Sequence, residues 1–284
     1  MSMGIHQILV DLGISYATPK DAEMHLAKYI SKKFQKAAAI YIEKNFRERE
    51  KWKFIKCLRM VWPEGKEDQF KVLDPFLIKH FIELCGDRVR VTEQLGSDTA
   101  VRANCLHQGG KFLWINICTR NLEAAKTENE FKKEFHLVIG SIYHECDHVF
   151  EEGSESFQDT YKETFLYLTQ KGEIRAHSKQ FAFLYHQVFP GLRFNFEKMK
   201  KMFWEAYGKN SEPANVMGHL EIWKDPEHYQ TDNPDVKAFI RDRIVPPMGI
   251  ITVKKCKKAY EAYIHFMEYF VDYFNKNGGH RIKL

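Results

Sequence analysis

The segment from Thr99 to Phe150 constrains the fold most, because its hydrophobic period changes from two residues to about three and a half. Two runs rich in β-type residues, Thr99–His107 and Lys111–Thr119, flank Gln108-Gly109-Gly110. Two such runs around a Gly-Gly turn predict an antiparallel hairpin. The apolar residues that follow recur at helical spacing, so we expect a helix soon after the hairpin.

The helix after the hairpin has a marked beginning. Thr127 and Glu130 fit the S/T-x-x-E capping box, in which each side chain accepts a hydrogen bond from the backbone of the other residue. Apolar residues then recur every three or four positions: Phe131, Phe135, Val138, Ile139 and Ile142. This spacing predicts an amphipathic helix from about Thr127 to Phe150, with one face turned to a core.

Helical patterns dominate the rest of the chain. They predict helices at residues 20–50, 75–85, 161–168, 173–188, 196–207 and 253–275. A short valine-rich run at 88–93 is typical of a strand, and the stretch at 211–247, rich in prolines and acids, is expected to be irregular. The predicted fold class is therefore α+β, mainly helical, with a small antiparallel sheet beside the 127–150 helix.

Composition excludes several classes of function. Apolar residues make up 44% of the 284 residues and charged residues 29%, which is ordinary for a soluble globular protein. A net charge of +5 is too mild to indicate a nucleic-acid-binding protein. No export signal and no uncharged apolar stretch of about 20 residues is visible, so we expect no membrane partner. Six cysteines without a C-x-x-C pair are typical of reduced thiols, which predicts a cytoplasmic location or a viral particle assembled in a host cytoplasm.

Residues 144–148 carry the motif that bears most directly on chemistry, His-Glu-Cys-Asp-His. On a helix each residue advances about 100°, so His144 and His148 lie about 40° apart on one face, one turn from each other. Two imidazoles placed in this way can share one tetrahedral metal ion. Glu145 is offset by one position, where it can take a proton from a water molecule at the metal's open position.

Two other interpretations of the motif stay open. A short motif can arise by chance on a solvated helix face, where Glu145 and Asp147 would pair with nearby lysines. The motif can also mark a metal site that has no catalytic role. Both interpretations keep the helix and change only its function.

A catalytic zinc needs a third protein ligand, and Glu173 is the preferred candidate. It lies 25 residues after His148, which allows the chain to leave the first helix, turn and return on another. Ala176 could let the two helices approach closely, and His177 lies one helical turn beyond Glu173 on the same face. We expect His177 to orient a ligand or to act as a catalytic residue that meets the substrate. Other acidic residues also follow His148 and stay alternatives: Glu151, Glu152, Glu155, Asp159 and Glu163.

These elements resemble the gluzincin metallopeptidases, and in particular the small minigluzincins of phages and bacteria. The resemblance consists of H-E-x-x-H on one helix and E-x-x-A, Glu173 to Ala176, on a following helix, both after a strand hairpin. It spans Thr99 to His186, less than a third of the chain. It implies that His144, His148 and Glu173 bind Zn2+.

The resemblance also implies roles for neighbouring segments. Glu145 would be the general base and acid, and the strand Lys111–Thr119 would be the sheet edge along which an extended peptide lies. We therefore expect a zincin-like catalytic core at residues 96–190. An N-terminal helical region at 1–95 and a C-terminal helical region at 191–284, packed on the core, would complete the chain.

The expected function is that of a zinc metallopeptidase that acts on a peptide or protein. Two alternatives stay open. One is a catalytically silent structural or assembly protein, for example of a virus particle, and the other is a metal-dependent toxin or hydrolase of a non-peptide amide. The donor that stabilises the oxyanion is open as well, with four candidates: His177, Tyr167, Tyr185 and His186. No motif sets the substrate preference or the oligomeric state.

Overall fold

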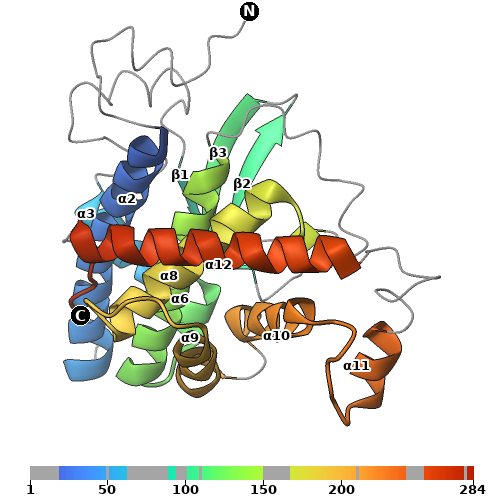
Figure 1. The fold of residues 1–284 in the computed structure, drawn as a ribbon. Coiled ribbons are helices and arrows are strands. Elements are labelled where there is room, and N and C mark those ends of the chain that lie inside the picture. The colour runs from blue at the N-terminus through green and yellow to red at the C-terminus, as the bar shows by residue number, and fades with distance from the viewer. Residues whose placement is uncertain are drawn as a thin grey trace, which may run out of the picture. The chain divides into compact units, whose positions relative to one another are not determined.

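The computed structural model describes residues 19–48, 51–62, 89–93, 101–108, 111–149, 167–208, 211–240, 253–277 and 280–284 (Figure 1). The chain divides into two compact units, residues 1–156 with 279–284, and residues 157–278. The helix expected at 75–85 lies outside the described residues, as do the first six residues of the one expected at 161–168.

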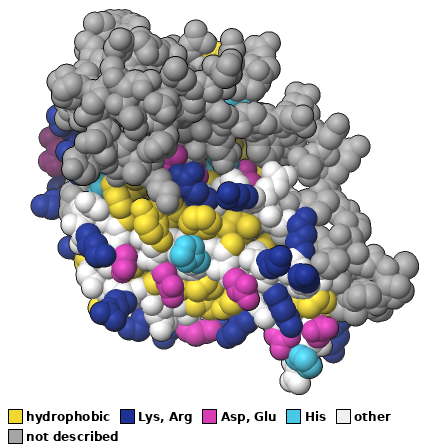
Figure 2. Space-filling model, turned by 45° about the horizontal axis from the view of Figure 1, so that its top comes forward, with side chains coloured by type: hydrophobic (Ala, Val, Ile, Leu, Met, Phe, Trp, Pro, Cys, Tyr) yellow, Lys and Arg dark blue, Asp and Glu magenta, His cyan; other side chains and the backbone are white. Residues whose placement is uncertain are grey.

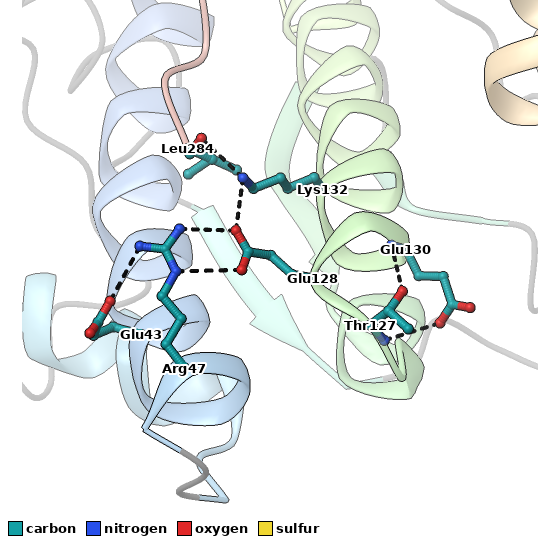
Figure 3. A network of polar contacts seen from close by, with 7 residues as sticks. All are labelled: Glu43, Arg47, Thr127, Glu128, Glu130, Lys132 and Leu284. Carbon is teal, nitrogen blue, oxygen red and sulfur yellow. Dashed lines mark hydrogen bonds and ion pairs between the residues drawn. The ribbon is translucent and has the colours of Figure 1, made fainter.

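The first unit combines helices with a small sheet, and its elements follow one another in this order: α2 (Pro19–Ile42), the π-helical turn η1 (Glu43–Arg47), α3 (Phe54–Val61), β1 (Val89–Thr92), β2 (Ala103–Gln108), β3 (Lys111–Cys118), α5 (Arg120–Ala124) and α6 (Glu128–His148). The predicted capping box is present at the start of α6. The Glu130 N–H donates to Thr127 Oγ1 at 3.1 Å, and the Thr127 N–H donates to the Glu130 carboxylate at 3.3 Å (Figure 3). The predicted helix after the hairpin is therefore confirmed.

The sheet has three strands in the order β1-β3-β2. β2 and β3 pair antiparallel, from Ala103↔Ile117 to Gln108↔Lys111, which confirms the predicted hairpin. β1 runs parallel to β3, so the expectation of a purely antiparallel sheet is wrong. The reason is that β1 pairs with a strand far later in the chain, and no tight turn fixes the direction of such a pairing.

β3 lies in the middle of the sheet, which corrects the expected peptide track along Lys111–Thr119. The backbone of β3 pairs with β1 on one side and with β2 on the other. An extended peptide cannot add to residues 115–118, because both edges of that segment are already paired. Buried Ile115 and Ile117 alternate with partly exposed Trp114, as expected for a sheet that packs one face on a core.

Aromatic side chains of α2 and α3 pack on the N-terminal half of α6. Tyr41 of α2 stacks on Phe131 of α6 with ring centroids 4.8 Å apart, and Phe54 of α3 meets the same ring at 5.7 Å. Phe135, one turn later, stacks on Phe131 at 6.1 Å. Each such pair contributes roughly 0.5–1.5 kcal/mol beyond the burial of its area. Since α6 also packs against β2 and β3, the helix that carries the H-E-x-x-H motif is held by helices and by the sheet.

A chain of polar contacts ties η1, α6 and residues 280–284 together (Figure 3). Glu128 Oε1 lies 3.0 Å from Arg47 Nη2 and 2.9 Å from Lys132 Nζ. Lys132 also donates to the main-chain oxygen of Leu284 at 3.2 Å. Hydrogen bonds from Arg47 and then Lys132 lower the pKa of Glu128 to about 2. The first turn of α6 is thus fixed by charge as well as by its cap.

The described part of the second unit is helical, with α8 (Lys171–Val188), α9 (Phe196–Met202), the π-helical turn η3 (Phe203–Tyr207), α10 (Glu212–Lys224), α11 (Pro234–Phe239) and α12 (Val253–Lys276). α8 and α12 lie side by side (Figure 1). The helices predicted at 173–188, 196–207 and 253–275 are confirmed. The expectation of irregular structure at 211–247 is wrong for α10 and α11. Pro213 and Pro234 lie in the first turn of these helices, where a missing N–H is tolerated.

Side chains of both charge signs are interspersed on the face drawn in Figure 2, with apolar side chains between them. Lys200 of α9 forms ion pairs with Glu197 and Glu221. Its charge is therefore compensated locally. Among the helices that the structure describes, none combines the length and the apolar character that a membrane span requires.

Candidate metal centre

The two histidines of the H-E-x-x-H motif face each other on α6. Their Nε2 atoms are 3.1 Å apart, and their ring centroids are 4.9 Å apart. Two nitrogens bound to one tetrahedral zinc at 2.0–2.1 Å are about 3.3 Å from each other. The separation in His144 and His148 therefore matches the requirement of a single metal ion to within about 0.3 Å.

Burial distinguishes the members of this motif. Four of them are buried: His144, Cys146, Asp147 and His148. The motif therefore does not lie on a solvated helix face, and that part of the first alternative is wrong. Glu145 differs from its neighbours because its side chain is half-buried. It keeps the access to water that a group exchanging protons with solvent requires.

A second pair of candidate ligands lies at the start of α8. Glu173 and His177 are one turn apart, with Glu173 Oε2 3.7 Å from His177 Nε2. Both side chains are buried. Glu173 occupies the first turn of α8, where the helix dipole favours a negative charge. One turn of α8 thus presents a carboxylate and an imidazole on the same face, as the spacing predicts.

The His177 ring is held by its neighbours. Phe181 stacks on it with ring centroids 5.6 Å apart, and Tyr167 meets it edge-on at 6.2 Å. On the side of Nδ1, Glu212 Oε1 lies at 3.7 Å. The sequence prediction missed Glu212, because it lies in the stretch that was expected to be irregular and belongs to no motif.

Each unit therefore offers a pair of side chains that could bind a metal ion. His144 and His148 form the pair of the first unit, and Glu173 and His177 form the pair of the second; all four residues are buried. Imidazole nitrogens and a carboxylate oxygen are donors that zinc accepts, and iron, nickel and copper accept imidazole as well.

Two of the four candidate oxyanion donors are placed elsewhere. The Tyr185 hydroxyl donates to the main-chain oxygen of Arg193 at 3.0 Å, and His186 Nδ1 lies 3.1 Å from Asn275 Oδ1. Tyr185 also lies 12 residues beyond Glu173 on the same helix, which corresponds to about 18 Å along its axis. These two residues are therefore too far from Glu173 to act with it, which leaves Tyr167 and His177.

Glu173 and Glu212 act on the same buried tyrosine. Tyr263 of α12 is buried, and its hydroxyl donates to the main-chain oxygen of Leu168 at 3.1 Å. Burial, then the charges of Glu173 and Glu212, raise the pKa of Tyr263 well above its ordinary value. Tyr263 therefore stays protonated and keeps its hydrogen bond to Leu168. This bond holds the backbone shortly before the first residue of α8.

The candidate metal ligands are identified from the sequence motif and their geometry alone. Comparison with protein families, with curated proteins and with solved structures finds no significant match to this chain.

Proposed function

We propose that this protein is a zinc-dependent hydrolase whose reaction is the cleavage of peptide bonds. The observation that carries the proposal is the 3.1 Å separation of the Nε2 atoms of His144 and His148, with Glu145 next to the first of them. Glu173 would be the third ligand, since two histidines and one glutamate are a zinc set that leaves a position open.

Each of the chain's own groups would have a defined task. Zinc, when bound, would polarise the scissile carbonyl and make a water molecule acidic near neutral pH. Glu145 would take the proton of that water as it attacks and return it to the leaving nitrogen. Its half-buried side chain supports this role. Tyr167 or His177 would donate a hydrogen bond to the carbonyl oxygen as negative charge develops there.

An extended peptide is the proposed substrate class. β2 is the outer strand on the hairpin side, and no other strand in the described ranges pairs with its far edge. Since α6 packs against β2, a peptide paired with that edge would run beside the helix that carries Glu145. This track replaces the one along β3, where residues 115–118 are paired on both sides.

A structural metal site is the second candidate, and one observation favours it. His177 lies one helical turn from Glu173, on the same face of α8. If both bound zinc together with His144 and His148, four protein ligands would fill a tetrahedral zinc and leave no open position. Such a site would stabilise the fold of a silent structural or assembly protein.

The variant Glu145→Gln separates the two candidates, because it keeps the size of the side chain but cannot accept a proton. In the peptidase, zinc content and melting temperature should stay near those of the parent, while cleavage of a quenched-peptide library falls by roughly 10²–10⁴. Glu268→Gln, at an exposed position of α12, is the matched control and should leave cleavage unchanged. Full hydrolysis by the Glu145 variant refutes the role given to that residue. A zinc-loaded parent that is inert on the library supports the structural site.

A further inference from the structure

A bidentate ion pair joins the sheet of the first unit to the helix that carries the motif. Arg102 Nε lies 2.6 Å from Glu134 Oε1, and Arg102 Nη2 lies 3.0 Å from Glu134 Oε2. The two side chains are 13% and 15% exposed, so water and salt screen this contact little. A guanidinium that donates to both oxygens of one carboxylate is fixed in angle as well as in distance.

Arg102 is also held through its main chain. It directly precedes β2, and its carbonyl oxygen accepts a hydrogen bond of 2.8 Å from the N–H of Cys118 at the end of β3. Glu134 lies in α6, upstream of the motif on the same helix. The ion pair therefore connects the start of β2 to the motif helix, and both residues belong to one compact unit.

The hydrogen bond to Arg102 shows which atoms of β2 face its far edge, with which no other described strand pairs. In an antiparallel ladder, opposite residues alternate between a hydrogen-bonded pair and a pair without hydrogen bonds. Arg102 and Cys118 form a hydrogen-bonded pair. The next residue, Ala103, lies opposite Ile117 and is therefore turned away from β3, as is Cys105 two positions later. Ala103 and Cys105 thus direct their main-chain N–H and C=O groups to the far edge.

Small side chains separate β2 from α6. Ala103 and Cys105 lie opposite Ile117 and Ile115, which are buried, so all four side chains are on the core face of the sheet. α6 packs against this strand. Small apolar side chains let a helix approach closely, but their contacts are not directional. The ion pair supplies a directional contact between strand and helix that such packing does not give.

We propose that Arg102 and Glu134 are positioning residues, which set where the far edge of β2 lies along α6 and thereby where a bound peptide lies relative to Glu145. The inference rests on the proposed function, in which a peptide pairs with that edge and Glu145 acts as the base. A peptide paired with Ala103 and Cys105 would move together with β2, so a shift of β2 against α6 would displace the scissile bond. A misplacement of about 1 Å is enough to slow an enzyme roughly 100-fold.

The test compares a substrate that reaches β2 with one that does not. Pairing with both Ala103 and Cys105 takes a peptide of at least three residues, because Asn104 lies between them. A long quenched peptide can use the edge, whereas a blocked dipeptide amide cannot. Arg102→Lys keeps the charge but loses the bidentate contact. Its kcat/KM should fall by roughly 10–100-fold for the long peptide and stay within about twofold for the dipeptide amide.

A second variant and a control accompany this comparison. The double variant Arg102→Glu with Glu134→Arg restores a bidentate pair in reversed order, so it should recover part of the loss on the long peptide. Glu128→Gln, on the same helix, removes the partner of Arg47 and should cleave both substrates like the parent. Zinc content and circular dichroism of all variants should match those of the parent, since neither the ligands nor the core is changed.

Three outcomes overturn the inference, and they can be told apart. Equal losses on the long peptide and the dipeptide amide indicate a general effect on the fold and remove the positioning role. Unchanged cleavage of both substrates by folded Arg102→Lys protein shows that the ion pair does not set the position of β2. Both outcomes leave the proposed function intact, whereas a zinc-loaded parent that cleaves neither substrate overturns the inference and the proposed function together.

Discussion

The hydroxyl of Tyr143 lies 2.7 Å from Nδ1 of His280. Tyr143 directly precedes His144, so a residue of the final segment contacts α6 beside the first histidine of the motif. Both side chains are buried, and their rings are 5.9 Å apart. Together with the contact from Lys132 to Leu284, this bond makes residues 280–284 part of the surroundings that fix α6.

Tyr143→Phe should therefore destabilise the first unit. The substitution keeps the ring but removes the buried hydrogen bond to Nδ1 of His280, which costs roughly 1–3 kcal/mol of the free energy of unfolding. Urea denaturation followed by circular dichroism measures the change. Tyr29→Phe, at a partly exposed position of α2, is the control and should cost less than about 0.5 kcal/mol. Equal effects of the two variants would contradict the role assigned to the buried contact.

The zinc content of the protein should depend on the two histidines of the motif. Protein purified without chelator should carry about one zinc per chain, because one ion is shared by the pair. His144→Ala and His148→Ala should each lose most of that zinc, whereas His265→Ala, at an exposed position of α12, should keep it. Elemental analysis of the three variants and the parent gives the answer. Parent protein without any bound transition metal would remove the basis of the site.

Acid should weaken the contacts at the start of α6 in a defined range of pH. The pKa of Glu128 is lowered from 4.5 to about 2, so its contribution to stability is fully present above about pH 4.5 and is lost as the pH falls towards about 2. The side chain is partly exposed, so the contribution is under about 1 kcal/mol. The difference in unfolding free energy between the parent and Glu128→Gln should shrink across this range. A difference that stays constant with pH argues against the assignment.

Two glycines of the second unit should respond in opposite directions to alanine. Gly208 has a φ of +91° and a ψ of 151°, a region that only glycine adopts without strain, so Gly208→Ala should cost roughly 1–3 kcal/mol. Gly218 lies within α10, and an added Cβ there meets no atom within 4 Å. Gly218→Ala should stabilise by about 0.5–1 kcal/mol. Thermal melts of the two variants and the parent measure both changes, and a shift in the same direction for both would contradict the assignment.

Local patterns predicted the part of the fold that places the motif. The Gly-Gly turn and the alternating runs determine the hairpin, and the pair Thr127 and Glu130 determines the start of α6. The i, i+4 spacing puts His144 beside His148 and Glu173 beside His177, because helix geometry alone fixes those neighbours. Each of these predictions depends on residues that are close in the sequence.

Features that depend on distant residues were not predictable in this way. The parallel partner of β1 and the central position of β3 follow from a pairing between Val89–Thr92 and residues 115–118, which no turn specifies. Glu212 meets His177 only because α10 packs against α12, and the prolines and acids near its start suggested a loop. Prolines are equally suited to the first turn of a helix, and tertiary packing decided between the two.

The order of the segments along the chain bears on how the protein is made. Residues 280–284 belong to the first unit, yet the whole second unit, residues 157–278, is synthesised before them. At about 5–20 residues per second, His280 leaves the ribosome roughly 6–25 s after residue 156. Until then the hydrogen bond between Tyr143 and His280 cannot form, so the face of α6 beside His144 is completed only after residues 157–278 have been made. A nascent chain stalled before residue 279 should therefore show a first unit that proteases cut more readily than in the protein that includes residues 280–284.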